Sequence, residues 1–518
     1  MFTFALLVGI YSYGIFTLGI LHILTSNNIQ AFSLSWLFIS TCIIFSHNPI
    51  KKIVVWIKSV KNLDKITLFL ILLLFIQASI NLIGAFGPEI GFDALWYHLT
   101  LPKIWLQRTS IDFIQGPVFK YSVMPKLTET IYAAALSFGS ESLPKVIHFT
   151  FGILTLVPLY KLAKSFLSRN FSLLVLVIFY SNLIVGWEST SAYVDLSRTF
   201  FEILALQLFI DRKYAFSAIT LGLAITVKLV ALSSLPIFIL LLLNGEGKNK
   251  LNKTLHFIFF TLFIPAPWLL FSAINTGNPF YPLFSPVLGT QTVSFNPKDV
   301  WDLFTANPDP VSPMYIISAP LIFLEKFTKQ SRGVSQIFIY AGISLFIWYL
   351  SPRAGGARFI LPYLPAFSIC TTYLISELKD RLLQKFLLSV CILVALSSTG
   401  YRLLANYKYL QVFTKQITRQ DFLIKHLSFD YGDYIDVNNY LFRKIPSDNT
   451  ILVAGINNLY YIPATVNFTH ISELQNTQKM HKFNYLLLRQ PDAGLNPDQN
   501  WELVSSEPIT NSKIYKHK

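Results

Sequence analysis

Long apolar runs separated by short polar segments recur along this chain, and only about the last 110 residues lack them. A helix needs about 20 apolar residues to cross the hydrocarbon core of a bilayer. Counting runs near that length predicts about thirteen membrane spans. We place them at 2–24, 30–46, 66–86, 143–163, 171–187, 196–210, 214–228, 230–243, 254–273, 313–327, 335–350, 358–376 and 386–404. Several are short, so we expect tilt, burial within the bundle, or kinks at Pro236, Pro265 and Pro267.

The composition supports an all-α membrane bundle with many spans. Of the 518 residues, 53% are hydrophobic and 13% charged, and the mean hydropathy is +0.50. A water-soluble core cannot hide that much apolar surface. The run 2–24 lacks a basic start and a small-residue cleavage site, so we expect it to stay as a membrane helix. Cys42, Cys370 and Cys391 fall in apolar runs, which predicts buried thiols and no disulfide framework.

The formal net charge of +15 comes from bases that collect in every second loop. They are Lys51, Lys52, Lys58, Lys61 and Lys65; Lys161, Lys164 and Arg169; Arg212 and Lys213; Lys248, Lys250 and Lys253; Lys326, Lys329 and Arg332; and Lys379, Arg381 and Lys385. This pattern is a topology signal facing anionic lipid, so we expect membrane lipids and no nucleic acid as partners. The positive-inside rule then predicts a plasma (cytoplasmic) membrane protein with a cytoplasmic amino terminus. The loop after span 66–86 and the carboxyl terminus lie outside.

The outer segments and the carboxyl-terminal region complete the domain plan. Segment 85–142 is long enough for two or three short helices lying on the membrane, and 274–312 is a long loop rich in Asn, Pro and Gly. After residue 404 the sequence predicts a small extracytoplasmic α/β domain. Its expected elements are a helix at 434–442, strands at 450–454 and 485–488, and a closing hairpin at 501–515. The domains are therefore 1–65, with two spans and a basic loop; 66–404, the transmembrane catalytic module; and 405–518.

The stretch 84–103 follows a span directly and is where we expect the chemistry. If it forms a short helix, Glu89, Asp93, Tyr97 and His98 share one side of it. Acids beside a membrane cavity are usually functional, although solvated charges on an ordinary interfacial loop are the alternative. Two carboxylates and an imidazole also suit Mg, Mn or Zn, so a divalent metal at Glu89, Asp93 and His98 is conceivable, with no cofactor clearly required.

Charged residues also break the apolar pattern at the outer ends of other spans. They are Glu188, Asp195, Lys228, Arg353 and Arg358. Asp195 opens a span and is either a helix cap or part of a site with Glu188 and Tyr193. Lys228 either snorkels to the interface or binds a lipid phosphate. The two arginines are either membrane anchors or an anion cradle. Together these charges fit an enzyme acting on an anionic lipid-linked substrate: a carboxylate removes a hydroxyl proton, and cations neutralise a departing phosphate.

Five short motifs, in this order, carry a resemblance to a known family. They are GFDALWYHL at 91–99, AYVDL at 192–196, TVK at 226–228, GNPFYP at 277–282 and RFILPYLP at 358–365. On these motifs, the chain resembles the GT-C superfamily of membrane glycosyltransferases. More narrowly, it is similar to the Rgt-like and protein O-mannosyltransferase-like branch, of the family 39 type. The resemblance covers about residues 66–376.

The resemblance implies a polyprenyl-phosphate sugar donor, catalysis on the extracytoplasmic face, and an acid of the first large outer loop as general base. By position that acid looks like Asp93. Many relatives carry two adjacent acids in this loop, whereas here Phe92 precedes Asp93 and Glu89 lies four residues earlier, which leaves metal dependence open.

The prediction is an inverting glycosyltransferase that moves a monosaccharide to an extracytoplasmic glycan, lipid or protein hydroxyl of the cell envelope. Asp93 is the catalytic residue, Lys228 and Arg358 hold the donor phosphate, and Asp195 and His98 orient sugar or acceptor. The expected substrate-binding residues are Glu89, Tyr97, His98, Glu188, Asp195, Lys228, Arg353 and Arg358. A secondary transporter and a non-catalytic envelope-assembly protein are the alternatives.

Overall fold

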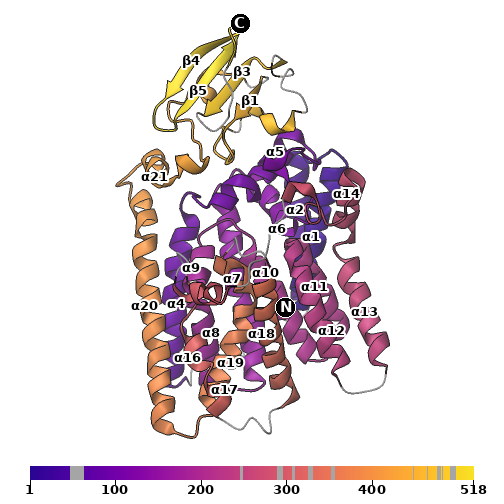
Figure 1. Cartoon of the computed structure of the whole chain (residues 1–518), viewed down its shortest axis with the longest axis vertical. Helices are drawn as coiled ribbons and strands as arrows, with labels where there is room; N and C mark the ends of the chain where they lie inside the picture. Colours follow the sequence, from indigo (N-terminus) through magenta and orange to yellow (C-terminus); the bar gives the residue numbers. More distant parts are fainter. Residues whose placement is uncertain are drawn as a thin grey trace.

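The protein is a tall helical bundle with a small sheet domain at one end (Figure 1). The computed structural model describes residues 1–46, 63–245, 249–288, 296–305, 310–324, 331–351, 356–446, 449–463, 465–474, 480, 482–489 and 497–518. Short helices form a layer between the bundle and the sheet (Figure 1). The predicted helical bundle and the predicted carboxyl-terminal α/β domain are therefore both present. The five-stranded sheet belongs to the carboxyl-terminal domain.

Six helices of the described residues are long and apolar enough to cross a membrane. They are α1 (Phe2–Ile20), α2 (Ser26–Phe45), α4 (Lys65–Phe86), α7 (Leu143–Lys164), α18 (Arg332–Leu350) and α20 (Arg381–Phe413). A seventh candidate is the pair α13 (Lys250–Phe263) and α14 (Ala266–Thr276), bent by 61°. Pro265 and Pro267 lie at this bend. Proline removes a helical hydrogen bond and clashes with the preceding turn, which bends the helix. The kink predicted there is confirmed.

Shorter helices fill the interior of the bundle. They are α8 (Arg169–Tyr180), α9 (Leu183–Glu188), α10 (Asp195–Ile210), α11 (Tyr214–Val227), α12 (Leu235–Leu243), α16 (Met314–Ser318), α17 (Leu321–Leu324) and α19 (Leu364–Ser376). Each predicted span coincides at least in part with one or more helices, and the count of thirteen crossings stays a prediction. Helix α10 is buried from Asp195 to Phe209, so it forms the centre around which the others pack.

Helix α2 lies at the edge of the bundle and exposes most of its side chains. Cys42 on this helix is exposed, whereas Cys370 and Cys391 are buried. The prediction that all three thiols are buried is therefore wrong for Cys42. An apolar run does not distinguish a side chain that faces protein from one on the outer surface of the bundle, where lipid rather than protein solvates it.

Four short elements of the segment between α4 and α7 form the layer beneath the sheet domain. They are the π-helical turn η1 (Ala94–His98), α5 (Thr100–Arg108), η2 (Pro117–Phe119) and α6 (Leu127–Ser137). Of the later loop predicted at 274–312, the described part contains η4 (Pro286–Leu288) and α15 (Lys298–Thr305). The catalytic stretch predicted from sequence thus lies where the bundle meets the sheet domain (Figure 1).

The carboxyl-terminal sheet has the strand order β2-β1-β3-β5-β4. Its strands are β1 (Thr450–Ala454), β2 (Asn467–His470), β3 (Tyr485–Arg489), β4 (Trp501–Glu507) and β5 (Ser512–His517). Strand β1 pairs in parallel with β2 and β3, and β5 pairs antiparallel with β3 and β4. The two predicted strands and the closing hairpin are confirmed, whereas β2 was not predicted.

Two predicted boundaries near this domain differ from the structure. Of the helix expected at 434–442, only the end is helical, as the start of α22 (Tyr440–Lys444). The Asp436 carboxylate accepts the Phe442 backbone N–H and so caps the first turn of α22, which keeps Asp436 itself outside the helix. Helix α20 continues beyond residue 404 to Phe413. Its last turns stay helical because Arg402, Asn406 and Tyr409 are buried against the bundle.

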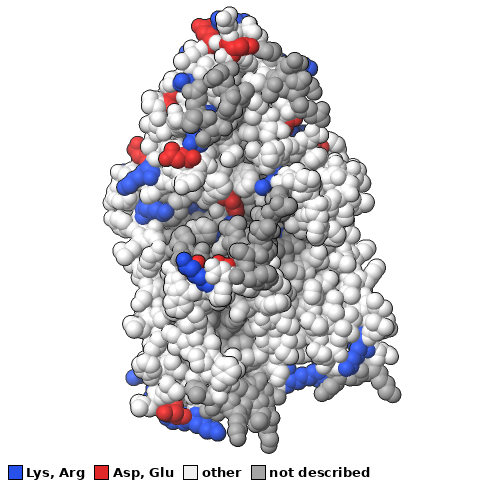
Figure 2. Space-filling view, in the orientation of Figure 1, with Lys and Arg blue, Asp and Glu red and all other residues white. Residues whose placement is uncertain are grey.

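Lysine and arginine side chains gather at the end of the bundle away from the sheet domain (Figure 2). Lys161 and Lys164 in the last turn of α7 belong to this group. Above them runs a broad belt with little charge (Figure 2). The positive-inside rule predicts that the end rich in Lys and Arg faces the cytoplasm. That placement stays a prediction.

Candidate active site

A cavity of about 300 Å³ lies where the short helices meet the bundle. Five separate segments line it, and the charged residues among them come from segments that are far apart in the sequence. The lining residues are Asp93, Trp96, Tyr97, His98, Tyr121, Met124, Pro125, Lys126, Glu129, Val194, Val227, Lys228, Leu229, Val230, Arg358 and Phe359. The cavity therefore gathers predicted site residues from three of the five motifs and borders a fourth at Val194.

The first charged pair in the cavity joins Asp93 to Arg358. A guanidinium nitrogen, Nη1, lies 2.7 Å from Asp93 Oδ2, and both side chains are about one-seventh exposed, at 15% and 14%. Tyr97 donates its hydroxyl to the same carboxylate oxygen at 3.3 Å. Arg358 also lies over the Tyr193 ring, and the Asp93 backbone N–H donates to the Tyr193 hydroxyl. Asp93 is thus held in place from three sides with one edge facing the cavity.

The second pair joins Asp195 to Lys228. Lys228 follows the last residue of α11, where the backbone turns to an extended conformation before the 3-10 segment η3 (Leu229–Ser234). Its ammonium group lies 2.7 Å from Asp195 Oδ1 and 5.0 Å from the Phe359 ring centre. Asp195 makes no side-chain cap at the start of α10, so the interpretation of Asp195 as a cap is wrong. Because Asp195 is fully buried and Lys228 is 15% exposed, the cation reaches the cavity.

A third cluster on the cavity wall consists of His98, Glu129 and Lys126. His98 Nδ1 lies 2.8 Å from Glu129 Oε1, which also accepts from Lys126 at 3.1 Å. Burial lowers the pKa of His98 despite its bond to Glu129. Burial would raise the pKa of Glu129, but Lys126 and His98 outweigh it and lower that pKa. A neutral His98 therefore donates through Nδ1–H to an ionised Glu129. Its Nε2, buried and without a hydrogen-bond partner among the described residues, is left as an acceptor.

Glu89 does not face the cavity. It is 1% exposed, and its carboxylate accepts the backbone N–H groups of Ile90 at 2.8 Å, Gly91 at 2.7 Å and Ala192 at 2.5 Å. Burial raises the pKa of this carboxyl, while nearby Lys145 and the three amides oppose the shift. Glu89 thus ties the loop before Asp93 to the turn before α10.

The predicted metal trio of Glu89, Asp93 and His98 does not fit a metal, because Glu89 is bonded to backbone amides and His98 to Glu129. Within the described ranges, no group of three His, Cys, Asp or Glu side chains could hold a metal ion.

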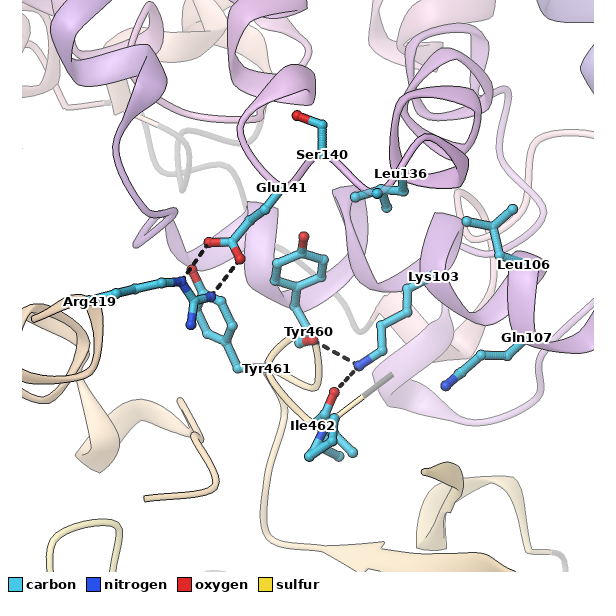
Figure 3. A pocket seen from close by; sticks show the side chains of 12 residues that line it. Lys103, Leu106, Gln107, Leu136, Ser140, Glu141, Arg419, Tyr460, Tyr461 and Ile462 are labelled. Carbon is cyan, nitrogen blue, oxygen red and sulfur yellow. Dashed lines mark hydrogen bonds and ion pairs between the residues drawn. The ribbon is translucent and has the colours of Figure 1, made fainter. Parts of the chain in front are cut away.

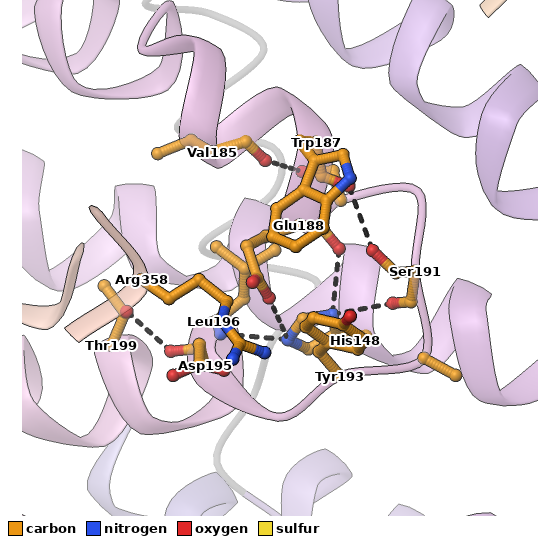
Figure 4. A network of polar contacts seen from close by, with 12 residues as sticks. His148, Val185, Trp187, Glu188, Ser191, Tyr193, Asp195, Leu196, Thr199 and Arg358 are labelled. Atoms are coloured by element: carbon orange, nitrogen blue, oxygen red, sulfur yellow. Dashed lines mark hydrogen bonds and ion pairs between the residues drawn. The ribbon is translucent and has the colours of Figure 1, made fainter. Parts of the chain in front are cut away.

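Glu188 lies in the buried network behind the cavity (Figure 4). Its neighbour His148 accepts the Leu196 backbone N–H at Nε2, at 2.9 Å, so the proton is on Nδ1. That Nδ1–H points at the carbonyl oxygens of Glu188 and Ser191, both at 2.9 Å. His148 therefore fixes the turn that leads from α9 into α10. Arg353 lies outside the described residues.

A buried polar network lies deeper in the bundle and joins the elements that carry the charged pairs. Arg198 Nη2 lies 3.2 Å from Glu202 Oε1 and donates to the Tyr363 hydroxyl at 2.9 Å. Ser234 and Tyr340 donate to the two Glu202 oxygens at 2.8 and 3.1 Å. These contacts connect α10, η3, α18 and the 3-10 turn η6 (Leu361–Tyr363) that follows Arg358. The network links the segments that carry Lys228 and Arg358 to α10.

The chain shares its fold with solved structures, which confirms the resemblance at the level of the fold alone. Two crystal structures of ArnT from Cupriavidus metallidurans align with the chain at a TM-score of 0.57. One is bound to undecaprenyl phosphate at 12% identity, and the other is in the apo state at 11%; each covers 87% of this chain and 98% of that one. The oligosaccharyltransferase of Archaeoglobus fulgidus aligns at a TM-score of 0.46 and 12% identity, over 81% of this chain and 69% of that one. The sequence matches no family model and no curated protein.

Several residues of the cavity were missed by sequence reasoning. Lys126 and Glu129 sit at the start of α6, and Trp96 and Tyr121 supply aromatic walls. The sequence predicted short helices within 85–142 but not which face of them meets the cavity. A Lys and a Glu three apart at a helix start are a weak signal, because most such pairs are solvated surface charges.

Proposed function

We propose that this chain is an inverting glycosyltransferase that moves a sugar from a polyprenyl-phosphate donor to a hydroxyl acceptor on the extracytoplasmic side of the membrane. The observation that carries the proposal is the meeting of Asp93, Lys228 and Arg358 at one cavity, with both cations partly exposed to it. Further support comes from the fold that the chain shares with ArnT, which was solved with undecaprenyl phosphate. On this proposal the cavity opens to the exterior and the carboxyl-terminal domain is extracytoplasmic.

The proposed chemistry uses a carboxylate and two cations. The acceptor oxygen attacks the anomeric carbon from the face opposite the phosphate while its proton passes to Asp93. The bond between the anomeric carbon and the phosphate oxygen breaks, and its electron pair stays on the polyprenyl phosphate. That group gains one negative charge, which Lys228 and Arg358 neutralise. The products are the inverted glycoside and polyprenyl phosphate, with Asp93 protonated.

The ion pair between Asp93 and Arg358 places the proposed base beside a proposed phosphate ligand. Arg358 Nη1 lies 2.7 Å from the Asp93 carboxylate. A donor phosphate competes for the same guanidinium. When Arg358 turns toward phosphate, the Asp93 carboxylate is released to accept a hydrogen bond from the acceptor hydroxyl. In the same complex, we expect His98 Nε2 to accept a hydrogen bond from a sugar hydroxyl.

An apolar cavity beside the charged one fits the hydrocarbon part of the donor. It holds about 280 Å³ between α15, α16, α18 and α19, and its lining includes Val300, Phe338, Ile360 and Phe367. Ile360 is two residues from Arg358, so the apolar and charged cavities meet along one segment. A lipid phosphate needs this combination of cations and adjacent apolar surface.

The test is a transfer assay with purified protein in nanodiscs and a panel of lipid-linked sugars with defined polyprenyl chains. We expect release of polyprenyl phosphate with at least one donor, and we expect the glycoside product to have the opposite anomeric configuration. A transporter would move a solute without cleaving the donor, and an assembly protein would do neither. Absence of donor cleavage with every sugar in the panel would contradict the proposal.

A further inference from the structure

A second cavity, of about 610 Å³, lies between the short-helix layer and the carboxyl-terminal domain (Figure 3). Its walls come from α5, from the end of α6 with the turn that follows, from α21 (Arg419–His426), and from the loop after β1. It shares no lining residue with the charged cavity. The proposed chemistry uses none of these residues, so the cavity needs its own explanation.

Lys103 joins the two sides of this cavity. It is 8% exposed, and its ammonium group donates to the backbone carbonyl oxygens of Tyr460 at 2.8 Å and of Ile462. Figure 3 shows this contact between α5 and the loop of the carboxyl-terminal domain. Because the hydrogens of the ammonium group are directed at backbone carbonyls, Lys103 fixes the wall and adds little capacity to bind an anion.

The charges on the opposite wall form a pair. Arg419 Nη2 lies 2.6 Å from Glu141 Oε2, and Nε donates to Oε1 at 3.3 Å. Arg419 also lies over the Tyr461 ring, 5.2 Å from its centre. Both members of the pair remain partly exposed, at 50% and 33%, so their outer edges face the cavity. A guanidinium and a carboxylate side by side offer neighbouring donors and acceptors with no net charge.

Two tyrosine rings complete the wall. The rings of Tyr460 and Tyr461 are 5.1 Å apart and tilted by 58°. The Tyr460 hydroxyl has no hydrogen-bond partner among the described residues and, in Figure 3, points toward the segment that carries Ser140 and Glu141. Aromatic faces bind apolar C–H surface, while the hydroxyl offers a polar tip. The cavity thus combines ring faces, planar polar groups and a low net charge.

We propose that this cavity binds a neutral carbohydrate, the glycan portion of the acceptor. A sugar presents an apolar C–H face and paired hydroxyls, which match the tyrosine rings and the Arg419–Glu141 pair respectively. A phosphate-bearing ligand fits less well, because Lys103 is directed at backbone carbonyls and the partly exposed Glu141 carboxylate on the wall repels an anion. The assignment to an acceptor, as opposed to a sugar in general, rests on the proposed glycosyl transfer.

One contact connects this cavity to the charged one. The Tyr461 hydroxyl donates to the backbone carbonyl of Glu89 at 2.7 Å. Glu89 begins the loop that ends at Asp93, and its carboxylate holds that loop against Ala192. A glycan resting on the tyrosines therefore lies against the same loop that positions the proposed base.

The experiment measures oligosaccharide binding to the full chain in nanodiscs free of sugar-based detergent. Saturation-transfer NMR is recorded with maltotriose, chitotriose and mannotriose as neutral probes and with inorganic phosphate as the anion probe. We expect at least one trisaccharide to bind, and we expect Tyr460→Ala and Glu141→Gln to weaken it about tenfold, the loss of one aromatic contact or one polar pair. Tyr431→Ala, which removes a tyrosine that is 74% exposed outside the cavity, is the matched control and keeps full affinity.

Three results would overturn the proposal. They are binding that is equal in all variants, no binding of any trisaccharide at millimolar concentration, and tighter binding of phosphate than of sugar. Donor cleavage is scored separately in the same preparation. Sugar binding at the tyrosines without cleavage of any donor would refute the acceptor assignment while leaving the carbohydrate site.

Discussion

The guanidinium of Arg358 lies 2.7 Å from the carboxylate of Asp93, although 265 positions separate them in the sequence. The pair brings together the first and last motifs of the chain at the charged cavity. Arg358 is a cation that a phosphate can bind, so the pair places the proposed base beside the proposed phosphate site.

Replacing Arg358 by Gln removes the cation that faces both Asp93 and the cavity. We expect donor cleavage to fall about 100- to 1,000-fold, the usual loss when one group that stabilises developing charge is removed. The measurement is kcat/KM for the lipid-linked donor. Arg443→Gln changes an exposed arginine on α22 and serves as the control. Equal kcat/KM values in the two variants would contradict the assignment of Arg358.

Glu89→Gln tests whether Glu89 holds the loop rather than the substrate. Glutamine cannot accept three backbone N–H groups as a carboxylate does, so we expect a loss of about 1–3 kcal/mol in stability. The thermal unfolding midpoint should drop, while the affinity for polyprenyl phosphate should be nearly unchanged. Glu502→Gln, on the exposed side of β4, should leave the midpoint in place. Loss of lipid affinity without loss of stability would instead assign Glu89 to binding.

The buried pair of Arg198 and Glu202 gives a third prediction. Glu202→Gln leaves the Arg198 charge without its partner in the bundle, which costs about 3–5 kcal/mol. The double variant Arg198→Met with Glu202→Leu removes both charges and should recover most of that loss. Thermal unfolding in nanodiscs measures all three proteins. A double variant as unstable as the single one would show that the pair does not behave as a coupled unit.

The pH dependence of stability follows from Lys103. Burial lowers its pKa from 10.5 to about 7 in the folded chain. Between these two values the unfolded chain binds more protons, so the stability contributed at this position rises with pH above 7. One pH unit in this range changes it by up to about 1.4 kcal/mol. The unfolding midpoint of the natural chain should therefore rise from pH 7 to pH 9 relative to that of Lys103→Met. Parallel profiles would refute the shift.

Sequence reasoning predicted the charged groups of the cavity better than it predicted their individual roles. Asp93, Asp195, Lys228 and Arg358 stand out because charges near lipid are costly and rarely accidental. Spacing alone grouped Glu89 with Asp93, yet the Glu89 carboxylate turns back to backbone amides. A sequence does not show which carboxylates backbone N–H groups will satisfy, since that depends on how two distant turns meet.

The same limit explains what was misjudged in the fold. Apolar runs locate helices well, because burial in lipid or protein requires the same side chains. They do not show which face of a helix meets protein, as the exposed Cys42 illustrates. Nor do they show where a helix ends when polar residues continue it, as the buried Arg402 and Asn406 do in α20. Strand β2 was not predicted because Asn467–His470 contains a single apolar residue and so shows no alternation of apolar and polar side chains. The strand depends on its pairing with β1.

The most direct test of the account is sugar transfer by Asp93→Asn, with binding of undecaprenyl phosphate measured on the same preparation. Asparagine keeps the size of the side chain but cannot take up the acceptor proton, and it no longer competes as an anion for Arg358. We predict that transfer falls below about one-hundredth of the natural rate while the lipid phosphate binds at least as tightly as before. Transfer at the natural rate by Asp93→Asn would contradict the central claim.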